Sequence, residues 1–590
     1  MGWTENPNWD LESIFAGGVD GDPFRDALIQ VEQELGEVCV RADALGDPAT
    51  DPAWGTVLPQ LLDLETRLHQ AWTFAACHSA AQSTASAPLR AEARCSEAWT
   101  RLVRAWTRPD HHVSSCSDKI FDALCERTEL ADVAPILRWR RAHAHLVLPE
   151  PKQALLAELT DPGLHAWGRR YKGLAGNMQV HVNQEVLSLS QAQNRLEDPE
   201  PGKRREAFEG LQAAWQQQLE PCADSLSHIT RFRTIVAQHQ GAEPLDEPMA
   251  DNRIGPAALE AVMETCRICK PLVARYLQAK ARLLGKQTLD WWDLRAPIGA
   301  TEARRSYQEA QQMVVDELDL FSPEMGQFVR TALEQQWVEA EDRPGKRGGA
   351  FCATLPVSGE IRVFLTFGGG ALSTLTLAHE LGHGYHGWVM RDLPRSRRRV
   401  PSTLAETASV FAENLLRRSS LARAQQDAQR LRLLDFELTA ACTFLTNIPV
   451  RFDFERSLYQ MRSRGPLDPS ELDERMQQLQ RSWYGPVLGR AFPEFWAAKL
   501  HFYLSSSPFY NFPYTVGYLF SSLVVERARA EGPAWASRYR ELLRATGVDT
   551  VEEVGARQLG VDLTRPEAYQ PVIERLSLAV EQFEALAIQS

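Results

Sequence analysis

Stretches rich in Ala, Leu, Glu, Gln and Arg recur along the sequence, and their apolar residues stand three and four positions apart. In an α-helix this spacing gathers the apolar side chains on one face, where they can pack against a core. Short breaks of Pro, Gly or Asp-Pro separate one stretch from the next. The pattern therefore predicts a mostly α-helical protein.

The length of the chain predicts more than one subdomain. Its 590 residues are 44% hydrophobic and 24% charged, which is typical of a globular protein too large for a single core. The clearest break is the segment 198–202, Asp-Pro-Glu-Pro-Gly, which cannot continue a helix. We place a boundary near residue 195, with an N-terminal helical domain over 1–195 and a second domain over 196–590. The N-terminal domain contains no cluster of residues that indicates chemistry.

The charge and the N-terminal segment argue against some classes of partner. The formal net charge of −13 at pH 7 disfavours general binding to nucleic acids or to anionic membranes. The first 15 residues have neither the basic nor the apolar region of a secretory signal. The sequence contains no run of about 18 apolar residues, so it predicts no transmembrane helix. The cytoplasm is the expected location.

The ten cysteines are scattered and show no disulfide framework, which predicts reduced thiols. Cys266 and Cys269 form a C-x-x-C pair inside a stretch with helical periodicity. No second Cys or His pair at zinc-finger spacing follows them. We interpret the two residues as ordinary helix residues, with a redox pair or a structural zinc pair as the alternative.

One segment departs from the helical pattern. Residues 350–355 and 360–367 are rich in β-branched and aromatic side chains and flank Pro-Val-Ser-Gly, which predicts two strands joined by a turn. Three glycines then end the second strand, and Ser373 or Thr374 suits the N-cap of a helix over 375–390. The edge of such a hairpin can align an extended peptide through backbone hydrogen bonds. A purely structural hairpin is the alternative.

The helix after the hairpin carries His379, Glu380 and His383 in the order His-Glu-x-x-His. Residues four apart lie on one face of a helix about one turn apart, so both imidazoles can point at one metal ion. Glu380 projects beside them and can accept a proton from water at the metal without binding the metal itself. The motif therefore predicts a metal-dependent hydrolytic centre.

A third metal ligand is expected, because catalytic zinc usually takes three from the protein. About two dozen residues downstream, Ser402 or Thr403 suits the N-cap of a helix that carries Glu406 and Glu413 on one face. Carboxylates that face a protein interior need a cation to compensate their desolvation. A metal ion supplies that cation, whereas glutamates that face solvent are the alternative.

These segments together resemble a known family. The run "KRGGAFC" at 346–352, the apolar strand, "TLAHELGHGYH" and "AETAS" with a second Glu seven residues on are similar to the zinc peptidases of the oligoendopeptidase F and thimet oligopeptidase family. The bacterial oligoendopeptidase F branch is the nearer one. Weaker similarity extends from "WDLESIF" near the start to "RFDFERSLY" and a Tyr-rich C-terminal segment, and so covers most of the chain.

The resemblance implies one zinc ion per chain, bound by His379, His383 and Glu406. It implies that Glu380 is the general base and later the proton donor. It also implies that Glu413 accepts a hydrogen bond from a ligand histidine and so fixes its orientation.

Further contacts follow from the same resemblance. Ala350 and Phe351, at the start of the first strand, are expected to contact the substrate. His386 stands three residues after His383, and this spacing argues against ligation by all three histidines of the helix. We expect His386 to support the ligands or to pack in the core.

The family also implies groups that stabilise negative charge on the reacting carbonyl oxygen. In the Tyr-rich segment, Pro513 suits the first residue of a helix that follows a loop. The resemblance assigns hydrogen-bond donation to His501 and to at least one of Tyr510 and Tyr514, whereas tyrosines at helical spacing can also simply pack in a core. Tyr518, on the same helix face as Tyr514, is a candidate for substrate binding.

The linker between the metal helix and Glu406 carries Arg395, Arg397, Arg398 and Arg399. A charge run of this kind usually forms a solvated loop. If it borders the substrate cleft instead, it attracts the terminal carboxylate of a peptide.

We therefore expect a two-lobed, mostly α-helical metallopeptidase with a small β-hairpin or sheet beside the metal helix. A deep central channel between the lobes follows from the family. The expected activity is zinc-dependent endopeptidase cleavage of short unfolded peptides. The alternatives are a carboxypeptidase or dipeptidase on a similar helical scaffold, and a non-catalytic peptide-binding protein, although the presence of every ligand and the base argues against the last.

Overall fold

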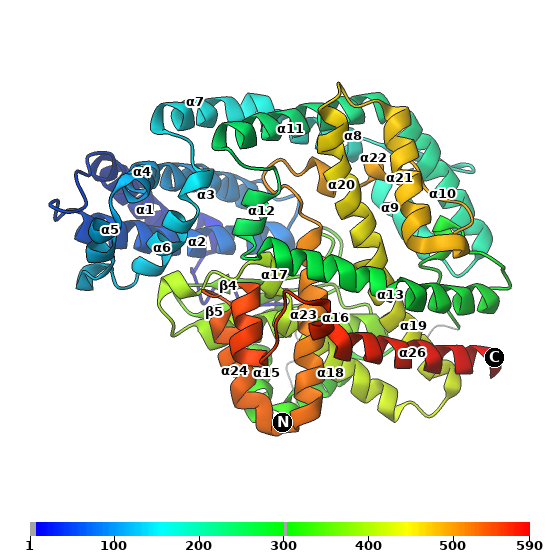
Figure 1. Cartoon of the computed structure of the whole chain (residues 1–590). Helices are drawn as coiled ribbons and strands as arrows, with labels where there is room; N and C mark the ends of the chain where they lie inside the picture. The colour runs from blue at the N-terminus through cyan, green and yellow to red at the C-terminus, as the bar shows by residue number, and fades with distance from the viewer. Residues whose placement is uncertain (1–6, 300–303, 590) are drawn as a thin grey trace. The chain divides into compact units, whose positions relative to one another are not determined.

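The computed structural model describes residues 7–299 and 304–589. Most of these residues lie in helices, and the strands are few and short (Figure 1), which confirms the predicted mostly α-helical fold. The chain divides into two compact units of three segments each. Unit 1 comprises Met1–Glu150, Glu302–Ser419 and Val524–Leu559, and unit 2 comprises Pro151–Thr301, Ser420–Leu523 and Gly560–Ser590. The domain boundary near residue 195 stays a prediction.

The first segment of unit 1 is a helical layer. Apolar residues at helical spacing on α2, such as Leu58, Leu61 and Leu68, are buried, and α2 packs against both α1 and α3. The hydrophobic core of this segment runs from Leu11 to Leu137. The helices are α1 (Asp22–Asp43), α2 (Trp54–Ala81), α3 (Ser86–Ala105), α4 (Thr107–Ser115), α5 (Asp118–Cys125) and α6 (Ala134–Ala142).

The other segments of unit 1 contain a small sheet and the helices around it. They comprise α14 (Tyr307–Phe321), α15 (Pro323–Glu334), β3 (Val338–Glu339), β4 (Phe351–Leu355), β5 (Glu360–Phe364), α16 (Ala371–Met390), α17 (Ser402–Ala405), α18 (Thr407–Arg423), α24 (Ala536–Ala545) and α25 (Val551–Val554). Helix α23 (Phe512–Glu531) belongs partly to each unit.

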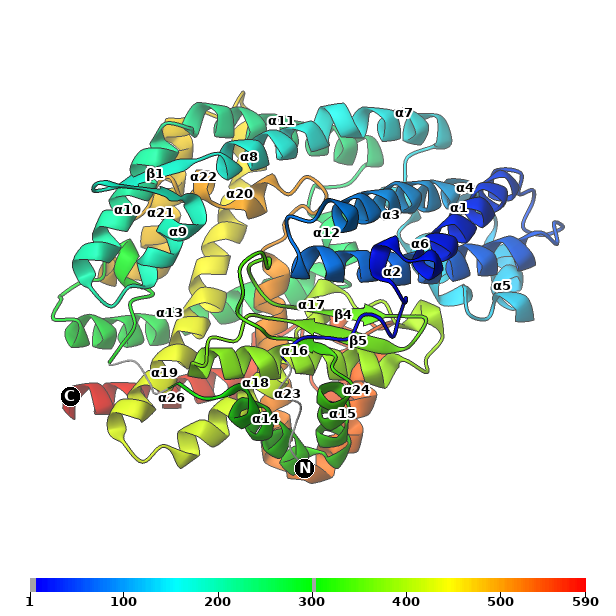
Figure 2. The same cartoon turned by 180° about the vertical axis from the view of Figure 1, so that it is seen from behind.

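The predicted hairpin is confirmed. Strands β4 and β5 pair antiparallel, with Phe351 opposite Phe364. Gly359 closes the turn between them with φ +73°, a left-handed conformation that favours glycine. Strand β3 pairs parallel with β5, so the order β3-β5-β4 leaves β4 at an edge. Figure 2 shows β4 and β5 beside α16, which contacts both strands.

Two predicted helix starts need correction. Helix α16 begins at Ala371 with Gly370 as its N-cap, because the Ser373 hydroxyl instead accepts a hydrogen bond from the backbone N–H of Gly368 at 3.1 Å. Likewise Pro401, rather than Ser402 or Thr403, is the N-cap of α17. The helix then breaks at Glu406, so Glu406 lies at the α17–α18 junction and Glu413 lies within α18, rather than both on one continuous helix.

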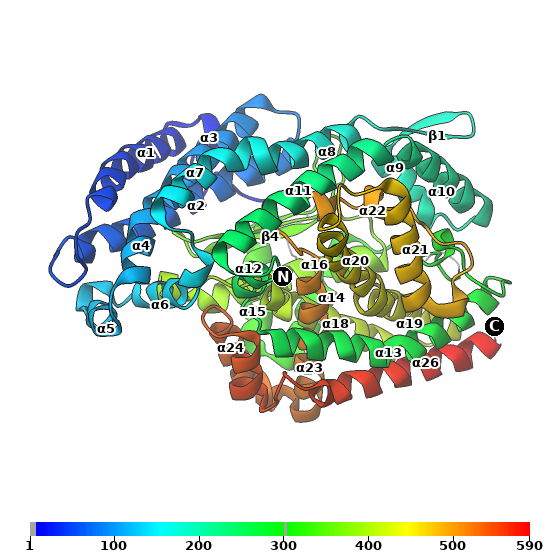
Figure 3. The ribbon, with the colours of Figure 1, turned by 45° about the horizontal axis from the view of Figure 1, so that its top comes forward.

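Unit 2 consists mainly of helices, with one two-stranded hairpin. Helix α13 lies beside α26 (Figure 3) and also packs against α19, and α10 begins at Pro201 after the predicted break. The elements are α7 (Glu150–Thr160), α8 (Ala166–Gly176), β1 (Gln179–Val182), β2 (Glu185–Ser188), α9 (Leu189–Asn194), α10 (Pro201–Gln216), α11 (Leu219–Gln240), α12 (Asp246–Asp251), α13 (Pro256–Leu283), α19 (Asp427–Cys442), α20 (Ile448–Arg462), α21 (Pro469–Tyr484), α22 (Phe495–Ala498) and α26 (Gln570–Gln589).

Helix α13 also carries the C-x-x-C pair. Both thiols are buried, and burial raises the pKa of Cys269 to about 12. Such thiols are poor nucleophiles at neutral pH, which supports their interpretation as ordinary helix residues.

Within the described ranges, no helix combines the length and the apolar character that crossing a membrane requires.

Candidate metal centre

Helix α16 and the α17–α18 junction bring together the three residues predicted as metal ligands. One nitrogen each of His379 and His383 and one carboxylate oxygen of Glu406 all lie within 4.8 Å of one another. Glu406 Oε2 is 3.3 Å from His379 Nε2 and 3.4 Å from His383 Nε2. No other set of His, Cys, Asp or Glu among residues 7–299 and 304–589 forms such a group.

A glycine lets the two helices approach closely enough to form this group. A Cβ atom on Gly382 would lie 2.5 Å from the carbonyl oxygen of Ala408 and 2.7 Å from the Cα of Ser409. Any larger residue would therefore push α16 away from α18. On α18, the Ser409 hydroxyl donates a hydrogen bond to Glu406 Oε2 at 2.7 Å and so fixes the orientation of that carboxylate.

The second glutamate contacts the other side of one histidine. Glu413 Oε2 lies 3.3 Å from Nδ1 of His379, and Arg417 lies 3.5 Å from Glu413 Oε1. A carboxylate in this place accepts the Nδ1–H hydrogen bond and leaves Nε2 free to bind a metal. The role that the resemblance implies for Glu413 stays a prediction.

The electrostatics of the group favour a cation. Burial acts to lower the pKa of His379, but hydrogen bonds and charges from Glu406 and Glu413 raise it to about 10. Burial acts to raise the pKa of Glu406, but His379 and His383 hold it well below its usual range. Glu406 therefore stays ionised in a buried setting, where a bound divalent cation would compensate its charge. Two imidazoles and one carboxylate are a donor set that fits zinc.

Glu380 is buried next to the ligands and is incompletely hydrogen-bonded. Its side chain is 5% exposed, and its Oε2 atom has no hydrogen-bond partner in the described part of the chain. Burial raises the pKa of this carboxyl group, although the charges of the two histidines oppose the shift. A buried acceptor without a partner, with a raised pKa, is suited to exchange a proton with a bound molecule.

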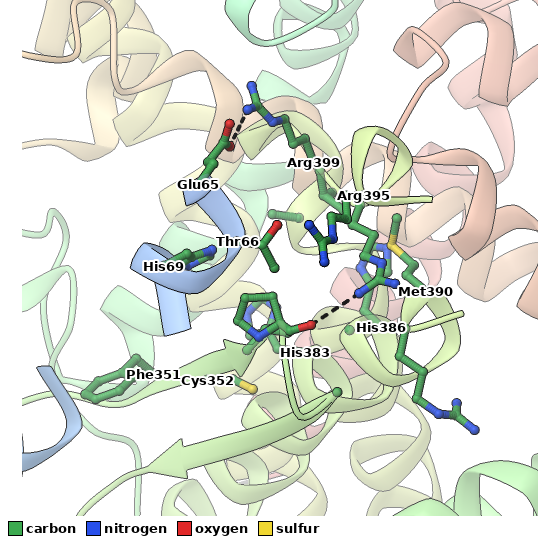
Figure 4. Close-up of a pocket in the computed structure, with 18 of the residues that line it drawn as sticks. Glu65, Thr66, His69, Phe351, Cys352, His383, His386, Met390, Arg395 and Arg399 are labelled. Carbon is green, nitrogen blue, oxygen red and sulfur yellow. Dashed lines mark hydrogen bonds and ion pairs between the residues drawn. The ribbon is translucent and has the colours of Figure 1, made fainter. Parts of the chain in front are cut away.

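These residues line a cavity of about 900 Å³ that lies within unit 1. In Figure 4, Phe351 and Cys352 of β4 lie on one side of it, and Glu65, Thr66 and His69 of α2 lie on another. Ala350, the other predicted substrate contact, also lines the cavity.

The sequence does not indicate that α2 forms part of the cavity wall, because residues 1–195 contain no chemical cluster. Glu65, Thr66 and His69 stand on a helix whose pattern indicates only packing, so no local signal marks them. The arginine linker was also interpreted mainly as a solvated loop, but Arg395, Arg398 and Arg399 line the cavity.

His386 lies outside the group of ligand atoms. Its ring is 4% exposed, and its Nε2–H donates to the hydroxyl of Thr546 at 2.8 Å, which itself donates to the carbonyl of Leu543. Burial lowers the pKa of His386 to about 4, so the ring is neutral at pH 7. It connects α16 to the C-terminal end of α24.

The predicted charge-stabilising residues form a cluster of their own in unit 2. The ring of His501 lies 5.7 Å from that of Tyr510 and 6.1 Å from that of Tyr514, and the two tyrosine rings are 5.5 Å apart. Burial, with the charges of Arg451 and Lys499, lowers the pKa of His501 to about 4. His501 stands on a short 3-10 helix, Leu500–Tyr503. Tyr518 stacks on the ring of Phe444, with 4.9 Å between ring centres.

The sequence matches the model of peptidase family M3 over residues 195–574. The chain belongs to peptidase family M3. This membership confirms the resemblance drawn from the motifs, and with it the predicted enzyme class, a metalloendopeptidase.

Relatives of this M3 peptidase cover most of its length. An oligoendopeptidase F homolog from Lactococcus lactis is 25% identical over 419 residues, which are 69% of this chain and 68% of that protein. The group B oligopeptidase PepB of Streptococcus agalactiae is 23% identical over 596 residues, 97% of this chain and 96% of its own.

Solved structures show the same fold. A Chlamydophila abortus protein superposes with a TM-score of 0.84 at 18% identity, over 99% of this chain and 98% of that one. Oligoendopeptidase-F from Enterococcus faecium superposes with a TM-score of 0.73 at 18% identity, over 96% and 99% of the two chains.

Proposed function

We propose that this M3 peptidase is a zinc-dependent endopeptidase that cleaves internal bonds of short oligopeptides in the cavity of unit 1. The observation that carries the proposal is the convergence of His379, His383 and Glu406 to within 4.8 Å, beside the buried and incompletely hydrogen-bonded Glu380. The oligoendopeptidase F names of several relatives support the class of substrate.

Two nitrogens and one carboxylate oxygen hold the metal in this proposal. Nε2 of His379, Nε2 of His383 and a carboxylate oxygen of Glu406 are the ligands, and Glu413 fixes the tautomer of His379 by accepting its Nδ1–H. A zinc ion held by these three residues would polarise the scissile carbonyl and acidify water. Ser409 keeps the Glu406 carboxylate turned towards the two histidines.

Glu380 moves the proton. Its carboxylate accepts a proton from the attacking water and then gives that proton to the nitrogen of the leaving amine. The burial of Glu380 and the lack of a hydrogen-bond partner at its Oε2 among the described residues support both steps, because this oxygen can accept a hydrogen bond and then a proton from water.

The edge strand β4 holds the substrate in register. A peptide adds to a free sheet edge through backbone hydrogen bonds, and the cavity follows β4 past Phe351, Cys352 and Thr354. We assign substrate contacts to Ala350, Phe351 and Tyr518.

Two kinds of neutral donor stabilise the oxyanion in this account. We assign that role to His501 and to at least one of Tyr510 and Tyr514. The lowered pKa of His501 keeps its ring uncharged at pH 7, so the ring can donate a hydrogen bond without adding a charge.

The test is the cleavage of a short internally quenched peptide that is blocked at both ends, by wild type and by Glu380→Gln. Zinc content is measured on both proteins, and the exposed Glu334→Gln is the control. We expect wild type and control to cleave the peptide, and Glu380→Gln to keep its zinc and lose cleavage by at least about a hundredfold.

Other outcomes separate the alternatives. A wild-type enzyme that leaves the blocked peptide intact but cleaves the same peptide with free ends is an exopeptidase. A chain that binds both peptides and cleaves neither is a binding protein. Full activity in Glu380→Gln would remove the proposed general base.

A further inference from the structure

Three arginines of the linker between α16 and α17 line the cavity of unit 1, and two of them are neutralised. Arg395 lies 2.6 Å from Asp63, and Arg399 forms an ion pair with Glu65 (Figure 4). Both acids belong to α2. These two pairs join the linker to α2 and leave little charge for a ligand.

Arg398 differs from its neighbours. Its Nε donates to the carbonyl of Leu393 at 2.7 Å, and its Nη1 donates to the carbonyl of Pro356 at 3.5 Å. Across residues 7–299 and 304–589, no carboxylate forms an ion pair with Arg398, and its Nη2 has no hydrogen-bond acceptor. Two neutral acceptors therefore fix the plane of the guanidinium, and no carboxylate of the described chain lies within ion-pair distance of it.

This arrangement makes the cation a binding group. The side chain is half-buried, and burial together with the neighbouring Arg395 lowers the pKa of Arg398, although the more distant charges of Asp392 and Asp132 oppose the shift. A half-buried charge of this kind is stabilised by any anion that reaches it. A guanidinium held in a fixed plane is suited to a carboxylate, which can accept hydrogen bonds from two of its nitrogens.

The position of Arg398 connects this charge to the substrate. Pro356, whose carbonyl accepts from Arg398, directly follows β4, and Thr354 and Pro356 line the same cavity as His379 and Glu380. A peptide that pairs with the β4 edge and continues past Leu355 therefore approaches Arg398.

We propose that Arg398 binds a carboxylate of the peptide substrate and so makes this enzyme prefer peptides that carry an acidic group at one position beside the scissile bond. This inference rests on the proposed endopeptidase function. The carboxylate belongs either to an Asp or Glu side chain or to the C-terminus of the peptide, since both present the same group.

The experiment compares kcat/KM for matched quenched peptides. In one series, blocked at both ends, a single Glu is moved along a neutral sequence and compared with Gln at each position. In the other, a neutral peptide ends in a free carboxylate or in an amide. The enzymes are wild type, Arg398→Gln, Arg398→Lys and Arg397→Gln, because Arg397 is exposed, adjacent and outside the cavity lining.

We expect wild type to cleave one acidic peptide at least about tenfold faster than its neutral match. Arg398→Gln should lose this preference, so that the acidic peptide loses far more of its cleavage rate than the neutral peptides, and the remaining cleavage of the neutral peptides shows that the variant is folded. Arg398→Lys should keep part of the preference, because it retains the charge without the planar donor pair. Arg397→Gln should behave as wild type. A preference tied to one Glu position identifies a side-chain carboxylate, and a preference for the free acid identifies the C-terminus.

Several results would overturn the inference. They are equal cleavage of acidic and neutral peptides by wild type, an equal loss on both kinds of peptide in Arg398→Gln, and the same loss of preference in Arg397→Gln. Cleavage of neutral peptides without a preference leaves the endopeptidase function intact. If wild type cleaves no peptide, binding of the same peptides measured by fluorescence anisotropy still tests the role of Arg398.

Discussion

His379 is the residue on which the proposed centre depends most, because each of its ring nitrogens faces a different carboxylate. Nε2 faces Glu406 and Nδ1 faces Glu413. In the proposed centre, the first carboxylate would share the metal with His379, and the second would fix the ring. Replacing one glutamate should therefore affect metal binding differently from replacing the other, although both lie similarly close to the same imidazole.

Glu413→Gln should weaken zinc binding about 10- to 100-fold without removing a ligand, because an amide is a weaker acceptor for the Nδ1–H of His379. Competition with a chromogenic chelator measures this affinity. The exposed Glu334→Gln is the control and should match wild type. Unchanged zinc affinity in Glu413→Gln would show that the contact does not orient the ligand.

A buried glutamate in unit 2 supports the loop that carries Tyr510. Glu455 is 2% exposed, and its Oε1 accepts a hydrogen bond from the backbone N–H of Phe509 at 2.7 Å. Phe509 has φ +52°, a conformation that costs a phenylalanine about 1 kcal/mol. Burial raises the pKa of Glu455 from 4.5 to about 7, although the charge of Arg233 opposes the shift.

This pKa predicts a dependence of stability on pH. Between pH 4.5 and about 7, Glu455 is more often protonated in the folded protein than in the unfolded protein. Its contribution to the free energy of unfolding is therefore complete below pH 4.5 and is lost as pH rises through 7. The loss is about 3 kcal/mol of unfolding free energy. In urea unfolding, Glu455→Gln should therefore gain stability relative to wild type between pH 5 and pH 8. A constant difference between the two proteins at both pH values would contradict this origin.

Among the elements, the contact between α16 and α18 sets the spacing of the proposed metal ligands. Gly382→Ala would place a methyl group 2.5 Å from the carbonyl oxygen of Ala408, so the helices must separate at a cost of about 1–3 kcal/mol. We expect a lower melting temperature and weaker zinc binding. Gly173→Ala in α8 is the matched control, because this glycine also lies within a helix and its Cβ meets nothing within 4 Å. Wild-type stability and zinc affinity in Gly382→Ala would contradict the close contact.

Elements with a strong local pattern could be predicted from the sequence, and elements that depend on distant partners could not. The β4–β5 hairpin follows from two runs of β-branched and aromatic residues around a turn that contains glycine. Strand β3 has only two residues and exists through its pairing with β5. The break at Glu406 and the cavity wall on α2 likewise depend on tertiary contacts, such as the hydrogen bond from the Val357 N–H to Gln70.

At the scale of the whole molecule, each unit is assembled from segments far apart in the sequence. Helical periodicity correctly predicts the class of fold, but a pattern along the chain does not indicate which segments meet. The break after residue 197 marks the start of α10, and it also lies near the start of the family match at residue 195. The compact units instead divide the chain at residues 150, 301, 419, 523 and 559.

This organisation predicts how fragments behave. Residues 1–150 should unfold cooperatively when produced alone, because their core lies between Leu11 and Leu137 and only a few side chains such as Phe351 pack against it from elsewhere. Residues 151–301 should not, because α13 would lose both α19 and α26. Circular dichroism during heating distinguishes the two cases. A cooperative transition in the second fragment alone would contradict the division into units.

We infer that unit 1 holds a catalytic zinc ion between α16 and the α17–α18 junction. The most direct test is anomalous diffraction, measured on both sides of the zinc absorption edge, from crystals of the enzyme supplied with zinc. We predict one strong peak about 2.0–2.2 Å from a nitrogen of His379, a nitrogen of His383 and a carboxylate oxygen of Glu406. A zinc peak at other residues, or none at these three, would contradict the account.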